Sequence, residues 1–413
     1  MTVQPLKAGA PIPGRSHAAP VGGRLLTLPY KILLALAALG TVLIVWRFAA
    51  GLGAATAMSD GYPWGLWITF DVVIGTALAC GGYAIAILVY VFNRGRYHPL
   101  VRPAVLTSAL GYTIAGLSVA VDVGRPWHMW KVPLFFWRWN LNSALLEVAL
   151  CIMAYVVVSW IELSPALLER WTASGREGLR RFAERTLPWV ERGLIWVLVI
   201  GMLLPTMHQS SLGSLMLLAG PRLHPLWNTP ILPLLFLINC LAMGYAAVVL
   251  ESTLSSRVFG RRPERRMLVT LERMAAWGSL FFVALRLGDV AVRGHIGLVL
   301  KPDLYAVLFW LENLLLCLAP FAGSFAYKAL SKRVYDPGRL FRGAMLIALG
   351  GALFRFDTYL VAFDPGPGWH YFPSVPEILI TVGLIAGELA VYLALVRKFP
   401  ILGGVRTAPA PAP

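Results

Sequence analysis

The stretch "YPWGLWITFDVVIGTALACGGYAIAILVYVF", from Tyr62 to Phe92, decides the fold class. It opens with tyrosine and tryptophan residues around a proline, and it continues as a long apolar run that contains a single carboxylate, Asp71. Tyr and Trp gather at membrane–water interfaces, and about 20 apolar residues cross the hydrocarbon as a helix. The stretch therefore predicts a membrane-spanning helix with Asp71 roughly two turns inside the hydrocarbon, where an unpaired charge costs several kcal/mol.

The composition of the whole chain supports this prediction. The 413 residues are 58% apolar and only 14% charged, whereas soluble domains are about 45–50% apolar and about 25% charged. The alternating pattern of a membrane barrel is absent, so we predict an all-α polytopic membrane protein. The net charge of +16 resides in short loops and forms no basic stripe, so we expect no nucleic-acid partner.

Ten segments are apolar enough to span a bilayer. An even number of spans places both termini on one side, and that side holds 27 of the 36 basic residues, against six on the other side. Cytoplasmic loops carry the excess of Lys and Arg, so we predict cytoplasmic termini in a bacterial inner membrane. The predicted spans are 30–50, 64–92, 103–122, 141–163, 190–208, 230–251, 272–292, 304–327, 341–361 and 376–396.

The segments outside the membrane domain (30–398) are short. Residues 1–29 are rich in Gly, Pro and Ala and lack the apolar core of a signal peptide, so we expect a disordered cytoplasmic tail. Residues 399–413 form a second, low-complexity cytoplasmic tail.

Cysteine and histidine usage argues against bound metal cofactors. The four cysteines lie in four different spans without C-x-x-C spacing, so we expect no iron–sulfur cluster in this chain. Among the seven histidines only His208 falls at the depth of a span, whereas a membrane haem needs two axial ligands. We therefore expect no haem.

Ionisable residues inside the spans are candidates for function, and most of them fall in the outer half of the membrane. Glu147 has no cation among its neighbours, so we expect it to hold and exchange a proton. His208 follows Pro205, which we interpret as the end of a helix, and it could titrate near neutral pH.

Other charges have structural interpretations. Arg286 and Asp289, at i,i+3, are expected to form a pair on one helix face. Arg355 and Asp357, at i,i+2, face different directions, so each needs a partner on another helix. Asp122 and Arg125 lie near enough to the interface for a structural role.

Several of these stretches carry a resemblance to a known family. "YPWGLWITFDVVIGTALACGGY", "FNRGRYHPLVRPAVLTSALGY", "VDVGRPWHMWK", "FFWRWNLNSALLEVALCIMAYV" and "LPTMHQSSLGSL" resemble the NrfD/HybB family of integral membrane redox subunits. The match covers the second to fifth spans closely. It is most similar to the membrane subunits of periplasm-facing [NiFe]-hydrogenases.

The resemblance implies a subunit that exchanges electrons with the quinone pool, menaquinone or ubiquinone. It implies two four-helix bundles, at 64–208 and 230–361, with the first and last helices peripheral. It also implies a periplasmic, ferredoxin-like iron–sulfur partner, and hydrogenase large and small subunits that complete a hydrogen:quinone oxidoreductase. The quinone site region then matches Asp71, Tyr112, Asp122 and Arg125, with Glu147 and His208 in proton transfer.

Three points stay open at this stage. Asp71 either lines the polar mouth of the quinone site or hydrogen-bonds Arg125. Tyr112, Glu147 and Glu251 could contribute to a proton path across the membrane. The aromatic outer surface between the third and fourth spans is either a dock for the partner or an ordinary aromatic belt, and its residues are Trp127, Trp130, Trp137, Arg138 and Trp139.

An ion- or proton-coupled transporter or channel is the alternative class. Such proteins bind their substrates near the bilayer midplane, often between inverted repeats. In this chain the charges gather towards one side and no convincing repeat is visible, which favours the redox subunit.

Overall fold

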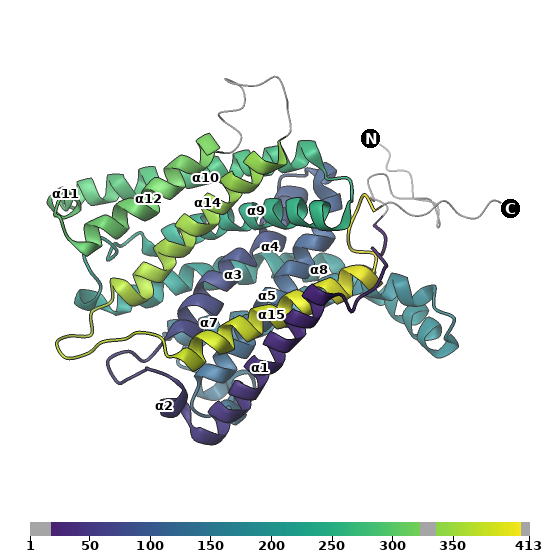
Figure 1. Ribbon diagram of the computed structural model, residues 1–413, viewed down its shortest axis with the longest axis horizontal. Coiled ribbons are helices and arrows are strands. Elements are labelled where there is room, and N and C mark those ends of the chain that lie inside the picture. Colours follow the sequence, from purple (N-terminus) through teal and green to yellow (C-terminus); the bar gives the residue numbers. More distant parts are fainter. Residues whose placement is uncertain (1–17, 323–335, 406–413) are drawn as a thin grey trace.

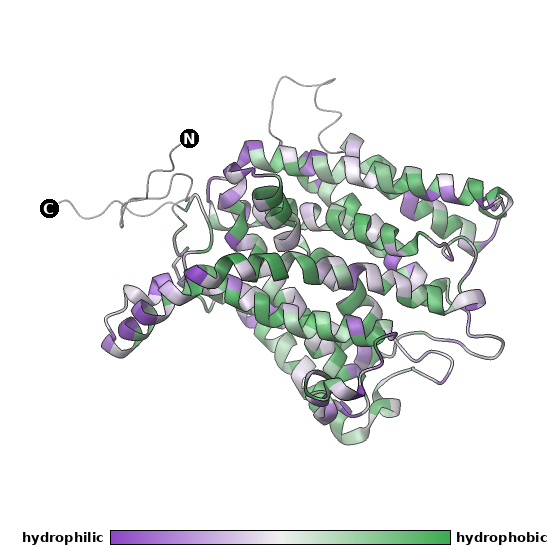
Figure 2. Ribbon diagram, turned by 180° about the vertical axis from the view of Figure 1, so that it is seen from behind, coloured by the Kyte–Doolittle hydropathy of each residue, from purple (hydrophilic) through white to green (hydrophobic). Residues whose placement is uncertain are grey.

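The computed structural model describes residues 18–322 and 336–405, so most of both predicted tails lies outside the described residues. Within these ranges the chain is helical, and an isolated bridge between Leu223 and Phe363 is its only β-type pairing. The helices run alongside one another, and hydrophobic residues predominate along them (Figures 1 and 2). The prediction of an all-α polytopic membrane protein is confirmed.

Nine helical segments among the described residues are long and apolar enough to cross a membrane. The tenth predicted span corresponds to α12 (Leu304–Ala322), which is shorter and runs up to the first residue that is not described. The nine segments are α1 (Leu28–Ala50), the run from η1 to η2 (Trp67–Val91), η3 with α5 (Gly95–Leu100 and Val101–Asp122), α7 (Ala144–Thr172), α8 (Glu177–Leu218), α9 (Leu232–Phe259), α10 (Arg265–Val292), α14 with η7 (Pro337–Phe356 and Asp357–Val361) and α15 (Val375–Lys398).

Helices α1 and α15 pack against each other at one side of the molecule (Figure 1). They cross at two glycines, Gly40 and Gly383, whose backbones are so close that a Cβ on Gly383 would lie 2.6 Å from the Gly40 Cα. Small residues allow such close approach in membranes, where association relies on van der Waals packing. The crossing holds α15 against the other spans.

We expect Gly383→Ala to destabilise the protein by about 1–3 kcal/mol, because its methyl group has no room at this crossing. Gly387→Ala is the matched control, since a Cβ there would meet the Ala37 Cβ at an ordinary 3.7 Å. Melting temperatures of the two purified variants in one detergent check the prediction. Equal melting temperatures would contradict it.

Arg355 joins three spans in the interior. Its guanidinium donates to Asn239 Oδ1 at 2.7 Å, to the Phe236 carbonyl at 2.7 Å and to the Val73 carbonyl at 3.0 Å. Val73 belongs to η1 (Trp67–Ile74), a π-helix, and the other two acceptors are on α9. The prediction that Arg355 finds its partners on other helices is confirmed.

Helix α8 differs from its predicted span. Pro205 lies inside the helix, which continues to Leu218, so His208 is not at a helix end. Proline removes one backbone hydrogen bond, and neighbouring hydroxyl groups occupy nearby carbonyls: Thr206 donates to Met202, and Ser210 donates to Thr206. His208 lies ten residues before the end of α8, which is roughly 15 Å along the helix axis at 1.5 Å per residue.

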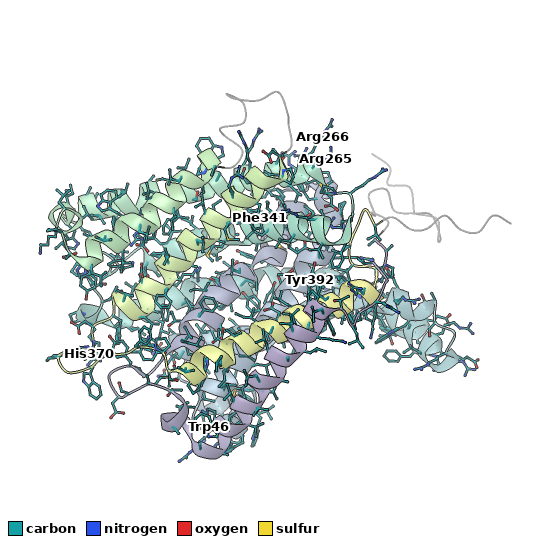
Figure 3. All side chains as sticks on the ribbon, in the orientation of Figure 1. Trp46, Arg265, Arg266, Phe341, His370 and Tyr392 are labelled. Atoms are coloured by element: carbon teal, nitrogen blue, oxygen red, sulfur yellow. The ribbon has the colours of Figure 1, made fainter. Side chains whose placement is uncertain are left out.

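The described start of α1 and the end of α15 lie at the same end of the molecule, as an even number of spans requires (Figure 1). The junction of α7 and α8 projects from this end, and many of its residues are hydrophilic (Figure 2). Arg265 and Arg266 lie towards this end, whereas Trp46 and His370 lie towards the opposite one (Figure 3).

We expect a single cysteine introduced at Arg266 to react only with reagents that enter the cytoplasm, because the basic loops stay inside. A cysteine introduced at His128 should react with impermeant reagents from the periplasm. Labelling of intact cells and lysed cells distinguishes the two positions. External labelling at residue 266 would contradict the topology.

Candidate functional site

Tyr112 and His208, two of the predicted site residues, meet in the interior between α5 and α8. The Tyr112 hydroxyl lies 3.3 Å from His208 Nε2, and both side chains are fully buried. The Tyr155 ring of α7 packs edge-on against Tyr112, with ring centroids 4.3 Å apart. Three spans therefore contribute to one buried polar group.

Gln209, which the sequence did not single out, completes this group. Its amide nitrogen lies 3.0 Å from His208 Nε2 and donates to Thr76 Oγ1 at 2.9 Å. His208 Nδ1 faces the Leu204 carbonyl at 3.3 Å, so Nδ1 carries the proton and Nε2 accepts.

The Gln209 amide oxygen is buried without a hydrogen-bond partner. Rotating the amide by half a turn would present this oxygen to a protonated Nε2, so the group can hold His208 with or without the extra proton. The arrangement therefore offers a hydrogen-bond partner to His208 Nε2 in either protonation state.

Asp71 is buried in η1, where its Oδ2 accepts hydrogen bonds from Ser118 at 3.1 Å and from Thr381 at 3.0 Å. Arg125, the alternative partner, is exposed at the surface. The other oxygen, Oδ1, is buried and lacks a hydrogen-bond partner. Asp71 thus joins the second span to α5 and α15.

Glu147 lies at the start of its span. It lies in the first turn of α7, is half-buried, and follows an N-cap at which Ser143 accepts from the Leu146 amide. The carboxylate is therefore near the free backbone N–H groups at the start of the helix. Cys151 and Tyr155 follow at i+4 and i+8 on the same face, so Glu147 is roughly 12 Å above the buried group.

Asp122 is the last residue of α5 and is buried, and the charge of Arg47 on α1 interacts with it. The Arg47 guanidinium donates to the neighbouring Val123 carbonyl at 2.8 Å. In the adjoining loop, burial and a 2.7 Å hydrogen bond to Glu377 raise the pKa of Tyr371 well above its usual range. Tyr371 therefore stays a neutral donor.

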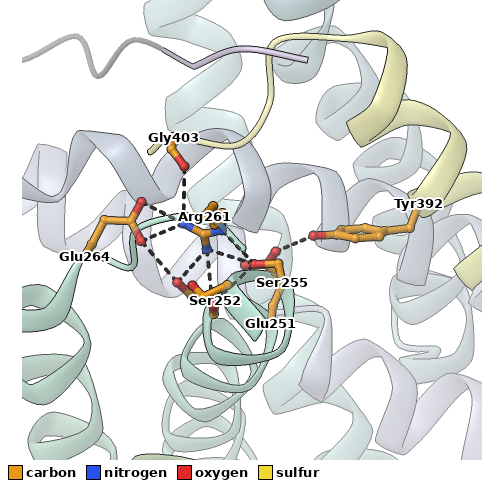
Figure 4. A network of polar contacts seen from close by, with 8 residues as sticks. Glu251, Ser252, Ser255, Arg261, Glu264, Tyr392 and Gly403 are labelled. Carbon is orange, nitrogen blue, oxygen red and sulfur yellow. Dashed lines mark hydrogen bonds and ion pairs between the residues drawn. The ribbon is translucent and has the colours of Figure 1, made fainter. Parts of the chain in front are cut away.

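Glu251, the predicted inner residue of a proton path, accepts a hydrogen bond from Tyr392 of α15 (Figure 4). Next to it, the buried Arg261 binds Ser252, Ser255 and Glu264. The network joins the C-terminal parts of α9 and α15.

Comparison with protein families adds a separate line of evidence. The family model described as "Polysulphide reductase, NrfD" matches residues 54–360, about three quarters of the chain. The chain belongs to the NrfD family.

Three relatives show how this NrfD-family chain compares with named proteins. It is 40% identical to "Probable Ni/Fe-hydrogenase 2 b-type cytochrome subunit" of Escherichia coli (strain K12), over 93% of this chain and 94% of the relative. It is 30% identical to "Menaquinone reductase, integral membrane subunit" of Nitratidesulfovibrio vulgaris, over 52% of this chain and 50% of the relative. It is 27% identical to "Protein NrfD" of Escherichia coli (strain K12), over 49% of this chain and 64% of the relative.

The first relative's name mentions a b-type cytochrome, but the residues of this NrfD-family chain do not fit haem. Among the histidines in residues 18–322 and 336–405, His208 alone lies well inside a span, away from helix ends and loops. Both of its ring nitrogens already face polar partners, at Leu204, Tyr112 and Gln209. A bis-histidine site would need a second buried histidine opposite it.

The polar face of α15 was largely missed from the sequence. Glu377, Thr381, Glu388 and Tyr392 are spaced by four, seven and four residues, which places them on one helix face. The Glu388 carboxylate lies over Gly111 of α5, where an added Cβ would be 3.6 Å from its Oε1, and its charge interacts with that of Asp71. Polar side chains therefore follow α15 from the Asp71 level to Glu251.

The predicted Arg286–Asp289 pair is wrong. Asp289 pairs with Arg293 at 2.6 Å and accepts from Thr229, whereas the buried Arg286 forms its ion pair with Glu312 of α12. Asp289 thus pairs with its i,i+4 neighbour, and Arg286 pairs with a residue on the facing helix. Sequence spacing alone does not show which of these partners is closer.

Proposed function

We propose that this chain is the quinone-interacting membrane subunit of a periplasm-facing redox complex. It passes electrons between an iron–sulfur partner and the quinone pool, and the partner belongs to a [NiFe]-hydrogenase. The observation that carries the proposal is the buried Tyr112–His208–Gln209 group, which can take up and release a proton at His208 Nε2. The names of the hydrogenase and menaquinone reductase relatives support the same class of reaction.

Quinone reduction requires two electrons and two protons. The electrons come from the docked partner by tunnelling. Within residues 18–322 and 336–405, no group of three or more His, Cys, Asp or Glu side chains could hold a metal ion. The exposed aromatic residues Trp127, Trp130 and Trp137 offer an outer docking surface. The protons come from side chains near the quinone carbonyls, for which His208 and Tyr112 are the best placed.

We propose further that the quinone site lies in a first four-helix bundle at 64–208, with a second bundle at 230–361 as its support. Asp71, Asp122 and Arg125 belong to the outer rim of this site, and Glu147 to its entrance. The protons reach it from the cytoplasm along the polar face of α15, starting at Glu251. Electrons from outside and protons from inside would then make turnover generate a membrane potential.

Affinity purification of the tagged chain from its native membrane tests the assignment. We expect an iron–sulfur subunit and both hydrogenase subunits to accompany it, and we expect the complex to reduce a soluble quinone with hydrogen. A chain that purifies without redox subunits and does not support quinone reduction would contradict the proposal.

We expect Glu147→Gln to lower quinone turnover by about tenfold, below the 10²–10⁴-fold range typical of a lost general acid. The smaller effect follows from its half-buried position in the first turn of α7, where it acts at the entrance. Turnover in membranes is compared with reduction of a soluble dye by the partner, which should not change. Full quinone turnover in the variant would remove Glu147 from the proton route.

A further inference from the structure

A cavity of about 580 Å³ lies between the ends of α7 and α15, at the end of the molecule where α1 begins. Its lining comes from the last turn of α7, the α7–α8 junction, the end of α15 and the segment that precedes α1. The volume is within the range of small-molecule sites, roughly 300–1,000 Å³.

The charge of the lining is one-sided. Arg170, Arg397 and Lys398 contribute three cations, and none of the ten residues that line the cavity is acidic. The nearest carboxylates in sequence are already paired: Glu169 with Arg102 at 2.7 Å, and Glu177 with Arg181. The cavity is therefore a site of uncompensated positive charge.

Helix capping does not account for the two cations on α15. Basic residues are common in last turns, where they offset the negative end of the dipole. At α15, however, backbone amides supply this compensation, since Val21 donates to the Val396 carbonyl at 3.0 Å and Gly22 to the Arg397 carbonyl at 3.1 Å. Arg170 and Lys398 remain exposed towards the cavity mouth.

The surroundings indicate a ligand from the membrane. Trp171 and Phe399 line the same cavity, with ring centroids 6.5 Å apart, and such rings favour the headgroup level. The neighbouring α1 exposes Leu28 and Ile32 at the same end, which gives acyl chains an apolar surface. Basic pockets between spanning helices on the cytoplasmic side suit anionic lipid headgroups.

We propose that this cavity binds the phosphate headgroup of an anionic phospholipid. Phosphate oxygens accept from Arg170, Arg397 and Lys398, and the acyl chains lie along α1 and α15. The proposal is independent of the quinone chemistry, because the cavity is at the opposite end of α15 from Asp71 and its partner Thr381.

The test uses the full-length chain, stripped of lipid in detergent and titrated with dioleoylphosphatidylglycerol, with binding counted by native mass spectrometry. The test variant is Arg170→Gln/Lys398→Gln, which leaves Arg397 in place because it also donates to the Arg24 carbonyl. The matched control, Arg257→Gln/Arg266→Gln, removes two exposed cations, one from the last turn of α9 and one from the first turn of α10.

We expect the wild type and the control to retain one phosphatidylglycerol molecule, and the test variant to bind it about thirtyfold more weakly. Phosphatidylcholine should not compete. Equal affinity in the test and control variants would overturn the proposal, as would displacement of the lipid by millimolar inorganic phosphate, which would indicate a soluble anion instead.

Discussion

Replacing His208 with leucine should lower donor-to-quinone turnover by about 10²–10⁴-fold, the range for a lost general acid or base. His208 Nε2 is the one atom in the buried group at which Tyr112 and Gln209 converge, so its loss interrupts proton transfer there. The complex should still assemble, and its partner should still reduce a soluble dye. The measurement is turnover with both acceptors in the same membrane preparation.

Tyr112→Phe separates chemistry from packing at this position, because it removes the hydroxyl and keeps the ring against Tyr155. Its control is Tyr359→Phe, which removes another buried hydroxyl, bonded to the Leu212 carbonyl at 2.8 Å. We expect quinone turnover to fall in the first variant alone. If both variants and His208→Leu retain wild-type turnover, the buried group is structural.

Replacing Glu388 with glutamine should lower quinone turnover by about 10²-fold and reduce the membrane potential formed at each turnover. Glu388 stands between Thr381 and Tyr392 on the polar face of α15, and glutamine keeps its shape but cannot carry the proton. The successive gaps along the helix are roughly 10 Å and 6 Å, distances that ordered water can bridge. Reconstituted complexes with a voltage-sensitive dye provide the measurement.

Glu162→Gln is the matched control for this route. Glu162 is also a carboxylate within a span, but it belongs to α7 and faces Gly201 of α8, where an added Cβ would be 3.6 Å from its Oε2. Glu388→Asp should restore part of the activity because it returns an ionisable group. Equal turnover and potential in Glu388→Gln, Glu162→Gln and the wild type would exclude α15 as the proton route.

The spans were predictable because hydropathy is a local property of the sequence. Residues 64–92, for example, contain both the aromatic residues of the interface and enough apolar residues to span the membrane. The helical segment Trp67–Val91 agrees with that prediction. Pro205 misled the prediction because a proline usually ends a helix in water, whereas α8 continues through it inside the membrane. His208 was therefore predicted too close to the surface.

The contacts between polar side chains were less predictable, because they depend on which helices face each other. Tyr112 and His208 were both candidate residues, but their contact, and the role of Gln209, follow from the packing of α5 against α7 and α8. Arg286 likewise forms its ion pair with Glu312 on another helix. The polar face of α15 is visible in the sequence as a spacing of four, seven and four residues, although none of these residues was predicted as part of the site.

A photoreactive quinone analogue tests the central claim most directly, because it reports where the quinone binds. Crosslinking in the intact complex, followed by peptide mapping, should place the label on α5, α7 or α8 near Tyr112 and His208, and excess native quinone should abolish it. Labelling confined to α9–α14 or to a partner protein would contradict the assignment of the quinone site to this buried group.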